Sequence, residues 1–277
     1  MIDTKVVAEI GFNHMNDRKL MTEMIEAAAE AGATYLKTQT FSASTLKAGP
    51  WDTDGRREIY EKVSLSKDDH NFLRLECVKN NIEFMTSCFN AKDIEYIAAL
   101  CNTIKVASPE VINIEMLEEI NYHYGKRYVN DVFVSTGAAT LNELEKCLDT
   151  LSNCNVTLLH CVSCYPCPLN KANLHRINML KVLCNKVGYS GHCESIYDAI
   201  ASLDFGVSII EKHFTTNRDL PGRDNQFAIL PSELKFLCNY IKNKNSMLKP
   251  RGAEYQECEK EFREKYRLRW TKDNVSS

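Results

Sequence analysis

The sequence contains no long hydrophobic run and no excess of charge of one sign. None of its apolar stretches approaches the roughly 20 residues that cross a membrane, and the N-terminal MIDTKVVAEIG enters a predicted strand without a signal-peptide pattern. The 34 Lys and Arg residues are balanced by 37 Asp and Glu, a net charge of −3, and both signs are mixed along the chain. The basic footprint of a nucleic-acid-binding protein is therefore absent. We expect a cytoplasmic protein with no nucleic-acid or membrane partner.

Cysteine, by contrast, is abundant, with 12 in 277 residues. Disulfide frameworks belong to short, loop-rich secreted chains, whereas most of these cysteines lie within apolar periodic segments. We interpret most of them as reduced, buried small residues. The run CVSCYPC, residues 161–167, has the spacing of an iron–sulfur or zinc segment. It lacks an obvious fourth ligand and overlaps a predicted strand end, so we assign no metal cluster to it.

Short apolar runs alternate with amphipathic segments throughout the chain. The predicted strands are residues 5–10, 34–40, 82–86, 103–107, 132–135, 156–160, 186–189 and 207–212. The predicted helices are residues 17–31, 66–80, 91–100 and 114–122, one from 140, one within 174–183, 195–203 and one from about 231. Such alternation predicts an α/β fold, a TIM (β/α)8 barrel with a parallel sheet. A doubly wound open sheet is the structural alternative.

The pattern predicts a single domain with a short C-terminal tail. Residues 1–250 would form the barrel, and residues 251–277, which are charged and weakly periodic, would form a peripheral helix or a partly ordered tail. The connection between the second strand and the helix from residue 66 is longer than most loops, which makes it a candidate substrate cover.

Polar side chains recur at the C-terminal ends of the predicted strands, where parallel barrels place their active sites. His192 and His213 follow neighbouring strands, so their side chains can converge on one metal ion. Taken singly, a histidine after a strand is more often a hydrogen-bonded structural residue. Two imidazoles with open positions suit a catalytic divalent ion. Glu9 is the nearest expected carboxylate, and Asp224 is a second candidate.

Lys37 and Lys105 are charged residues within otherwise apolar strands, where a buried ammonium is costly unless it is paired. One interpretation is a structural salt bridge to a carboxylate such as Glu211. The other is that both ammoniums point into the mouth of the barrel and hold an anionic phosphate or carboxylate. Hydroxyl groups at neighbouring strand ends would assist them, from Ser87, Ser108, Ser135 and Ser190.

Together these segments resemble the catalytic barrel domain of the sialic acid synthase (N-acetylneuraminate synthase) family. The matching motifs, in the family's order over about residues 4–245, are AEIGFNHMND, YLKTQTF, IKVASPE, VSTGAAT, LLHCVSCYP, VGYSGH and IEKHFTTNRDLPGRD. The resemblance implies an enzyme that condenses phosphoenolpyruvate with an N-acylated hexosamine, N-acetylmannosamine-like, or its 6-phosphate. It would use a divalent metal, commonly manganese, with magnesium or cobalt as alternatives. The products would be a nonulosonic acid and phosphate.

The resemblance also implies roles for individual residues. His192 and His213 would be the metal ligands, and Glu9 and Asp224 would lie at the reacting centre. Either Glu9 or Glu110 would transfer protons. The sugar would be faced by Gln39, Glu110 and Tyr165. Phosphoenolpyruvate would be bound by Lys37, Ser87, Lys105, Ser108, Ser135 and Ser190, with Ser163 where the family often has Asn.

The sequence departs from the family at three places. Family members usually read SDH before the first metal histidine, whereas this chain reads Ser190-Gly191-His192, so a carboxylate near the metal is missing. Where STPF is common, the chain reads TSCF at residues 86–89. The family's C-terminal antifreeze-like domain, which in relatives supplies an arginine across a dimer, has no counterpart among the matched segments. A homodimer, or a separate subunit replacing that domain, is therefore the partner to expect.

Two other functions fit parts of the pattern. Lys37 or Lys105 could form a Schiff base in an aldolase, because barrel lysines also serve that chemistry. A barrel that has lost catalysis could serve as a sugar-binding or partner subunit. Gly191 favours the second alternative, whereas the retention of both histidines and both lysines argues against it.

Overall fold

A computed structural model describes residues 3–124 and 131–270, and within them the strands close into a parallel barrel. The strands are β1 (Lys5–Glu9), β2 (Tyr35–Thr40), β3 (Glu83–Cys88), β4 (Thr103–Val106), β5 (Asp131–Ser135), β6 (Asn155–Cys161), β7 (Val187–Gly191) and β8 (Ile209–His213). Each strand pairs with the next in sequence, and β8 pairs with β1. The predicted TIM barrel is confirmed, and the open-sheet alternative is wrong because β1 and β8 are joined.

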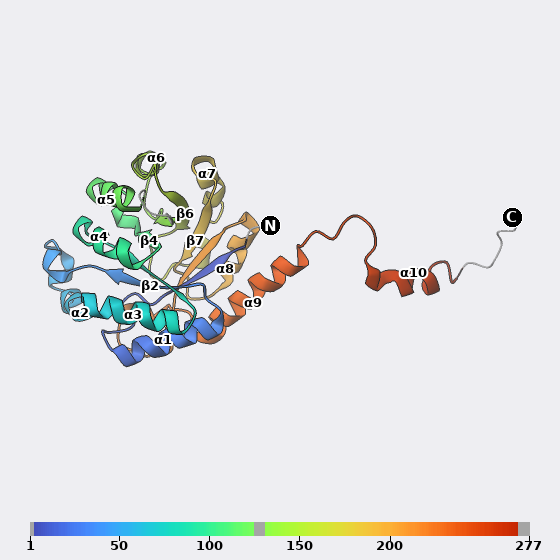
Figure 1. Cartoon of the computed structure of the whole chain (residues 1–277), viewed down its shortest axis with the longest axis horizontal. Helices are drawn as coiled ribbons and strands as arrows, with labels where there is room; N and C mark the ends of the chain where they lie inside the picture. The colour runs from blue at the N-terminus through green and yellow to red at the C-terminus, as the bar shows by residue number, and fades with distance from the viewer. Residues whose placement is uncertain (1–2, 125–130, 271–277) are drawn as a thin grey trace.

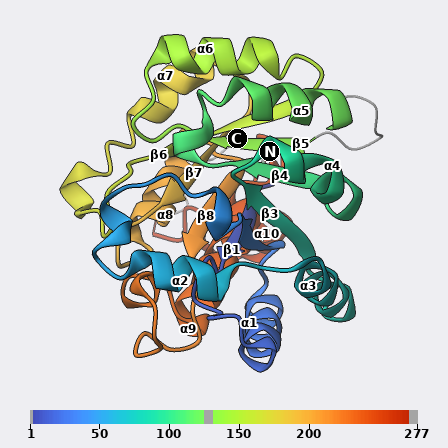
Figure 2. The same ribbon diagram turned by 90° about the vertical axis from the view of Figure 1, so that its left-hand side faces the viewer.

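Helices surround the barrel (Figures 1 and 2). They are α1 (Arg18–Ala31), α2 (Arg56–Val63), α3 (Lys67–Lys79), α4 (Ala91–Leu100), α5 (Ile114–Tyr124), α6 (Leu141–Thr150), α7 (Arg176–Leu183), α8 (Tyr197–Ser202) and α9 (Pro231–Met247). The cap of α6 shows how the sequence sets such boundaries. Thr140 Oγ1 accepts a hydrogen bond from the backbone N–H of Glu143, whose carboxylate accepts from the backbone N–H of Thr140.

Helix α2 was not predicted. Its sequence, RREIYEKV, buries only Val63, so it has no apolar stripe of the kind that marks a helix against a core. It lies within the long connection that was expected to be a loop. All the helices that were predicted are present, within a few residues of the expected bounds.

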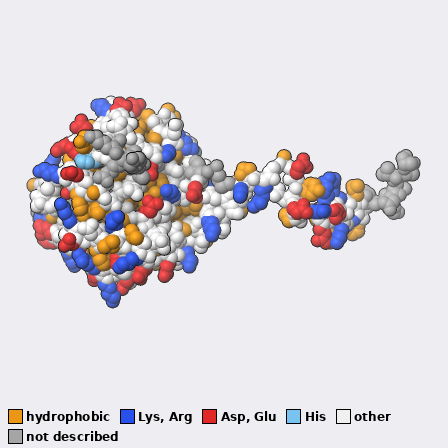
Figure 3. Space-filling view, in the orientation of Figure 1, with side chains coloured by type: hydrophobic (Ala, Val, Ile, Leu, Met, Phe, Trp, Pro, Cys, Tyr) orange, Lys and Arg blue, Asp and Glu red, His pale blue; other side chains and the backbone are white. Residues whose placement is uncertain are grey.

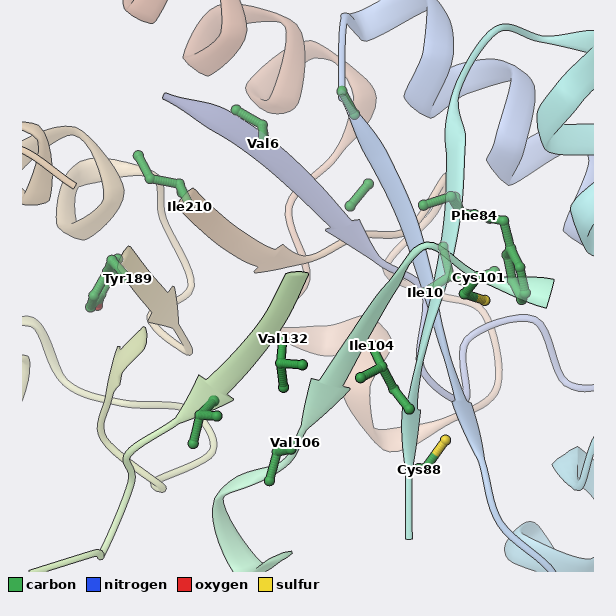
Figure 4. Close-up of a cluster of buried hydrophobic side chains, with 14 of the residues drawn as sticks. Val6, Ile10, Phe84, Cys88, Cys101, Ile104, Val106, Val132, Tyr189 and Ile210 are labelled. Carbon is green, nitrogen blue, oxygen red and sulfur yellow. The ribbon is translucent and has the colours of Figure 1, made fainter. Parts of the chain in front are cut away.

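Inward side chains change from apolar to polar along the strands. On the outer face, residues such as Val6, Val132 and Ile210 belong to the core between strands and helices (Figure 4). Inside the barrel, a separate apolar cluster consists of Val7, Tyr35, Met85, Phe133, Leu159 and Ile209. Because side chains alternate between faces, the residue two positions later faces inward again. At that position stand Glu9, Lys37, Ser87, Ser135, Cys161 and Glu211. The apolar cluster is therefore the floor on which a polar layer rests.

The chain leaves the barrel after α9. Figures 1 and 3 show the remainder extending away from the globular part, with the short helix α10 (Lys260–Tyr266) near its end. The described residues of this tail, 251–270, are almost all exposed, and 271–277 lie outside the described part. No helix among the described residues is both long and apolar enough to cross a membrane.

Candidate active site

A cavity of about 640 Å³ opens at the C-terminal ends of the strands. Most of the predicted site residues line it: Glu9, Lys37, Gln39, Ser87, Lys105, Ser108, Ser135, Tyr165, Ser190, His192, His213 and Asp224. Residues that are distant in sequence meet there because every strand ends at the same rim.

Two predicted site residues lie outside that lining. Glu110, in the short helix at residues 108–110, accepts a hydrogen bond from the side chain of Asn113 at 2.7 Å. Ser163 is exposed on the loop after β6, with its hydroxyl close to Gly137 and near that of Ser108. Their contacts with substrates stay predictions.

Four buried charged side chains meet at the base of the cavity. Lys37 Nζ contacts the Glu9 carboxylate and lies 3.8 Å from Glu211 Oε1. Lys105 Nζ lies 3.4 Å from the same Glu211 oxygen. The salt-bridge interpretation is confirmed, because both ammoniums lie near the Glu211 carboxylate, and both also line the cavity. Their binding of an anion stays a prediction.

Hydroxyl groups extend this charged layer. Lys37 Nζ donates to Ser87 Oγ at 3.0 Å, and Ser190 Oγ donates to Glu211 Oε1 at 3.1 Å. Ser135 Oγ and Glu211 Oε2 are buried and have no hydrogen-bond partner within residues 3–124 and 131–270. Buried polar atoms rarely stay unpaired in a protein, so this layer has room for the polar groups of a ligand.

The environment shifts the pKa values of these four charged groups in different directions. Burial raises the pKa of Glu9 to about 7, although Lys37 opposes the shift. Burial would also raise the pKa of Glu211, but Lys105 and Lys37 outweigh it and hold that pKa below its usual range. Burial lowers the pKa of Lys105, whereas Glu211 and Glu9 overcome burial and raise the pKa of Lys37. Lys37 is thus the more firmly charged ammonium, because two carboxylates flank it.

His192 and His213 approach each other at the rim, with ring centroids 5.5 Å apart. The Nδ1–H of His192 donates to the carbonyl oxygen of Val162 at 3.0 Å, which leaves Nε2 as the free acceptor. Burial lowers the pKa of His192 to about 4 and that of His213 well below its usual range. Both rings are therefore neutral near pH 7, which is the form that binds metals.

The residues present fit a divalent ion held by few protein ligands. Within residues 3–124 and 131–270, no group of three or more His, Cys, Asp or Glu side chains is arranged to hold a metal ion. His213 Nδ1, however, is buried without a hydrogen-bond partner there, 3.8 Å from Asp224 Oδ2. That distance is too long for a hydrogen bond but shorter than two metal–ligand bonds of about 2.1 Å each. His213 and Asp224 can thus approach one ion, and the ring of His192 lies beside them at the same rim, with its centroid 5.5 Å from that of His213.

The cysteine run does not form a metal site. Cys161 Sγ lies 3.6 Å from Ser108 Oγ, whereas the thiols of Cys164 and Cys167 donate to the carbonyl oxygens of the prolines that follow them. All the cysteines in the described residues are free thiols, and most are buried, as expected.

Part of the cavity lining was not foreseen. Arg56, Ile59 and Tyr60 reach the cavity from α2, so the long connection does contribute to the site. The ring of Tyr60 packs edge-on against Phe12 and Phe41, with centroids 5.5 and 5.9 Å apart. The only signal for these residues was the length of the connection, because their side chains lack periodicity.

Relatives identify the kind of protein that has this site. Residues 24–252 match the model of the NeuB family. The chain belongs to the NeuB family. N,N'-diacetyllegionaminic acid synthase of Campylobacter jejuni is 32% identical over 260 residues, which are 87% of this chain and 76% of that protein. Pseudaminic acid synthase of Helicobacter pylori is 30% identical over 254 residues, 86% of this chain and 73% of that one.

A solved structure places this NeuB-family chain in the same group. The N-acetylneuraminic acid synthetase of Leptospira borgpetersenii, solved in complex with citrate, superposes with a TM-score of 0.82 at 28% identity. The match covers 98% of this chain and 93% of that one. The predicted membership of the sialic acid synthase family is confirmed, and so is the prediction that the protein is an enzyme of the synthase class.

Proposed function

We propose that this enzyme condenses phosphoenolpyruvate with an N-acylated hexosamine, N-acetylmannosamine-like or its 6-phosphate, to give a nonulosonic acid and phosphate. The reaction would depend on a divalent ion, Mn²⁺ first, with Mg²⁺ or Co²⁺ as alternatives. The observation that supports it is one cavity with two buried ammoniums at its base and two neutral imidazoles at its rim. The synthases of legionaminic and pseudaminic acids named above support the class of product.

The base of the cavity suits phosphoenolpyruvate, which carries a carboxylate and a phosphate. Lys37 and Lys105 offset its charge, and the free Ser135 hydroxyl can donate to one of its oxygens. A buried, preorganised set of donors holds an anion more strongly than water does. Both ammoniums can thus interact with the anionic groups of phosphoenolpyruvate.

The sugar would occupy the upper part of the cavity, between the histidine rim and α2. Gln39, Tyr60 and Tyr165 all line the cavity. When bound at His192 and His213, a divalent ion supplies a Lewis acid that polarises the aldehyde oxygen of the open-chain sugar. Holding both substrates in one cavity makes their reaction effectively intramolecular.

Proton transfer falls to Glu9. The π electrons of the C2=C3 bond of phosphoenolpyruvate form the new bond from C3 to the aldehyde carbon, whose oxygen takes up a proton. Water then adds to C2 and gives up a proton, and phosphate leaves with the C2–O bond electrons as the C2 hydroxyl becomes the ketone. Glu9 is 1% exposed, and its Oε1 accepts a hydrogen bond from Gln39 at 2.9 Å, so its carboxylate is held at the cavity wall. With a pKa of about 7 it can accept a proton from that water near neutral pH.

The test is a phosphate-release assay. The purified chain is incubated with phosphoenolpyruvate, Mn²⁺ and a panel of N-acylated hexosamines, each with and without a 6-phosphate. We expect release with at least one sugar and none without a sugar or after chelation. A folded, metal-loaded sample that releases no phosphate with any sugar would show that the proposal is wrong.

A Schiff-base aldolase is the second candidate, since burial lowers the pKa of Lys105 toward the neutral amine that such chemistry needs. Borohydride in the presence of substrate distinguishes the two. Irreversible inactivation with a mass increase on Lys105, insensitive to chelation, would favour the aldolase. Chelator sensitivity without trapping supports the synthase.

A further inference from the structure

Between two cavity residues of β8 stands a lysine that faces the other way. Lys212 lies between Glu211 and His213, but its side chain passes to the outer side of the barrel and is 1% exposed. Its ammonium donates to Asp198 Oδ1 at 3.2 Å, to Asp198 Oδ2 at 3.0 Å and to the carbonyl oxygen of Cys193 at 2.8 Å. All three donors of this ammonium are thus accounted for.

Asp198 reaches this lysine from α8. Its carboxylate is buried and also accepts a hydrogen bond from the hydroxyl of Tyr189 at 2.9 Å. Tyr189, on β7, belongs to the same outer layer of the core (Figure 4). Asp198 is therefore bonded to side chains from both strands that lead to the histidines.

The carboxylate occupies the space beside Gly191. A Cβ built at Gly191 would lie 2.5 Å from the Tyr189 ring and closer still to Asp198 Oδ2, nearer than real side chains approach. Gly191 is the register partner of Lys212 on the neighbouring strand. A side chain at position 191 would thus stand next to Lys212, in the place that Asp198 fills from the helix.

We propose that Asp198 is a positioning residue, which fills the space beside Gly191 from α8 and orients the ammonium of Lys212. Lys212 is covalently joined to His213, and its ammonium binds the carbonyl of Cys193, the residue after His192. The Lys212 ammonium therefore links the backbone next to His192 with the backbone next to His213, and Asp198 orients this ammonium. The inference rests on the proposed metal role of the histidines. It also means that Gly191 is not evidence for a lost activity.

A double variant separates positioning from plain stability. Removing one member of a buried ion pair is strongly destabilising, whereas replacing both with apolar groups is often neutral. Asp198→Asn leaves the ammonium without its charged partner. Asp198→Ala combined with Lys212→Met removes both charges, but also removes the bond to the Cys193 carbonyl.

The experiment measures Mn²⁺ affinity by calorimetry, together with the melting temperature of the metal-free protein. We expect Asp198→Asn to lower the melting temperature and the double variant to recover most of the loss. Mn²⁺ affinity should fall about 10-fold or more in both, as for other groups that orient metal ligands. If the double variant regains wild-type affinity along with its stability, the pair is only a stability element and the inference is wrong. A wild-type chain that binds no Mn²⁺ would overturn it as well.

Lys244→Met is a control at a nearby, more exposed ion pair. It removes an ion pair with Asp204, 2.6 Å long, between α9 and the segment directly after α8. Its Mn²⁺ affinity should equal that of the wild type, and an equal loss there would overturn the inference by showing a general loosening. Kinetics add a second readout, since KM for phosphoenolpyruvate should stay constant in the double variant while kcat falls. Failure of the phosphate-release assay leaves the affinity result standing, so the two proposals fail separately.

Discussion

The two faces of β8 carry buried ion pairs of different construction. On the inner face, Glu211 Oε1 is shared between Lys37 and Lys105 at 3.8 and 3.4 Å, and Glu211 Oε2 lacks a hydrogen-bond partner among the described residues. On the outer face, Lys212 has three acceptors between 2.8 and 3.2 Å. The inner group has unpaired hydrogen-bonding atoms and lines a cavity, whereas the outer ammonium has all its donors paired and is buried.

This difference distinguishes a binding site from its support. Incomplete pairing of buried polar groups is costly, and beside a cavity a bound ligand or water can complete it. Complete pairing in the outer layer indicates a role in holding the strands. Changes on the inner face should therefore alter turnover more than stability. Changes on the outer face should alter stability more than turnover, and they should also lower metal affinity.

The largest effect is expected from His213→Ala, at the C-terminal end of β8. Losing a ligand should abolish Mn²⁺ binding in calorimetry. Turnover should fall on the order of 1000-fold, because a Lewis acid contributes several kcal/mol. His123→Ala, on the outer helix α5, is the control and should behave as wild type. Turnover at the full rate in His213→Ala would show that the metal assignment is wrong.

Lys37→Met should have the next largest effect. It removes the ammonium that contacts Glu9 and Ser87, so kcat/KM for phosphoenolpyruvate should fall roughly 10- to 100-fold, the equivalent of one charge-assisted hydrogen bond. Initial rates at varied phosphoenolpyruvate measure it. Lys79→Met, which removes an exposed pair with Glu76, is the control. An unchanged kcat/KM would contradict the inner face as the anion site.

Gly191→Ala tests the outer face. The added methyl group meets Asp198 and the Tyr189 ring, and such overpacking costs about 1–3 kcal/mol. Denaturant unfolding of the metal-free protein measures the loss. In an Asp198→Ala background the same methyl should cost less, because one of the two obstacles is gone. An equal cost in both backgrounds would mean that Asp198 does not fill this space.

The last prediction concerns pH dependence. The pKa of Glu9 is raised from 4.5 to about 7 in the folded protein, so between these values the folded state holds more protons than the unfolded state. Glu9 therefore makes stability fall as pH rises through that window. Glu9→Gln should remove this contribution, whereas Glu30→Gln on α1 should not. Parallel stability–pH curves for wild type and Glu9→Gln would contradict the raised pKa.

Local patterns predicted most of the fold. Alternating apolar runs located the strands, and the Thr140–Glu143 spacing located the start of α6. They missed α2, because a helix that covers a cavity buries little of its surface and needs no apolar stripe. The position of Asp198 was equally hidden, since nothing in its own helix indicates that it faces Lys212, 14 residues away.

The sequence by itself determined which polar groups reach the rim of the barrel. Parallel strands place their C-terminal residues together, so the residue type at each strand end is enough to predict the histidine pair and the lysine pair. Only the tertiary structure decided how those groups are paired. Whether Glu211 or Glu9 neutralises Lys37, and which carboxylate takes the space at Gly191, depends on side-chain directions and on distances of a few ångströms between elements. Such contacts join residues far apart in the chain, and periodicity within one element carries no information about them.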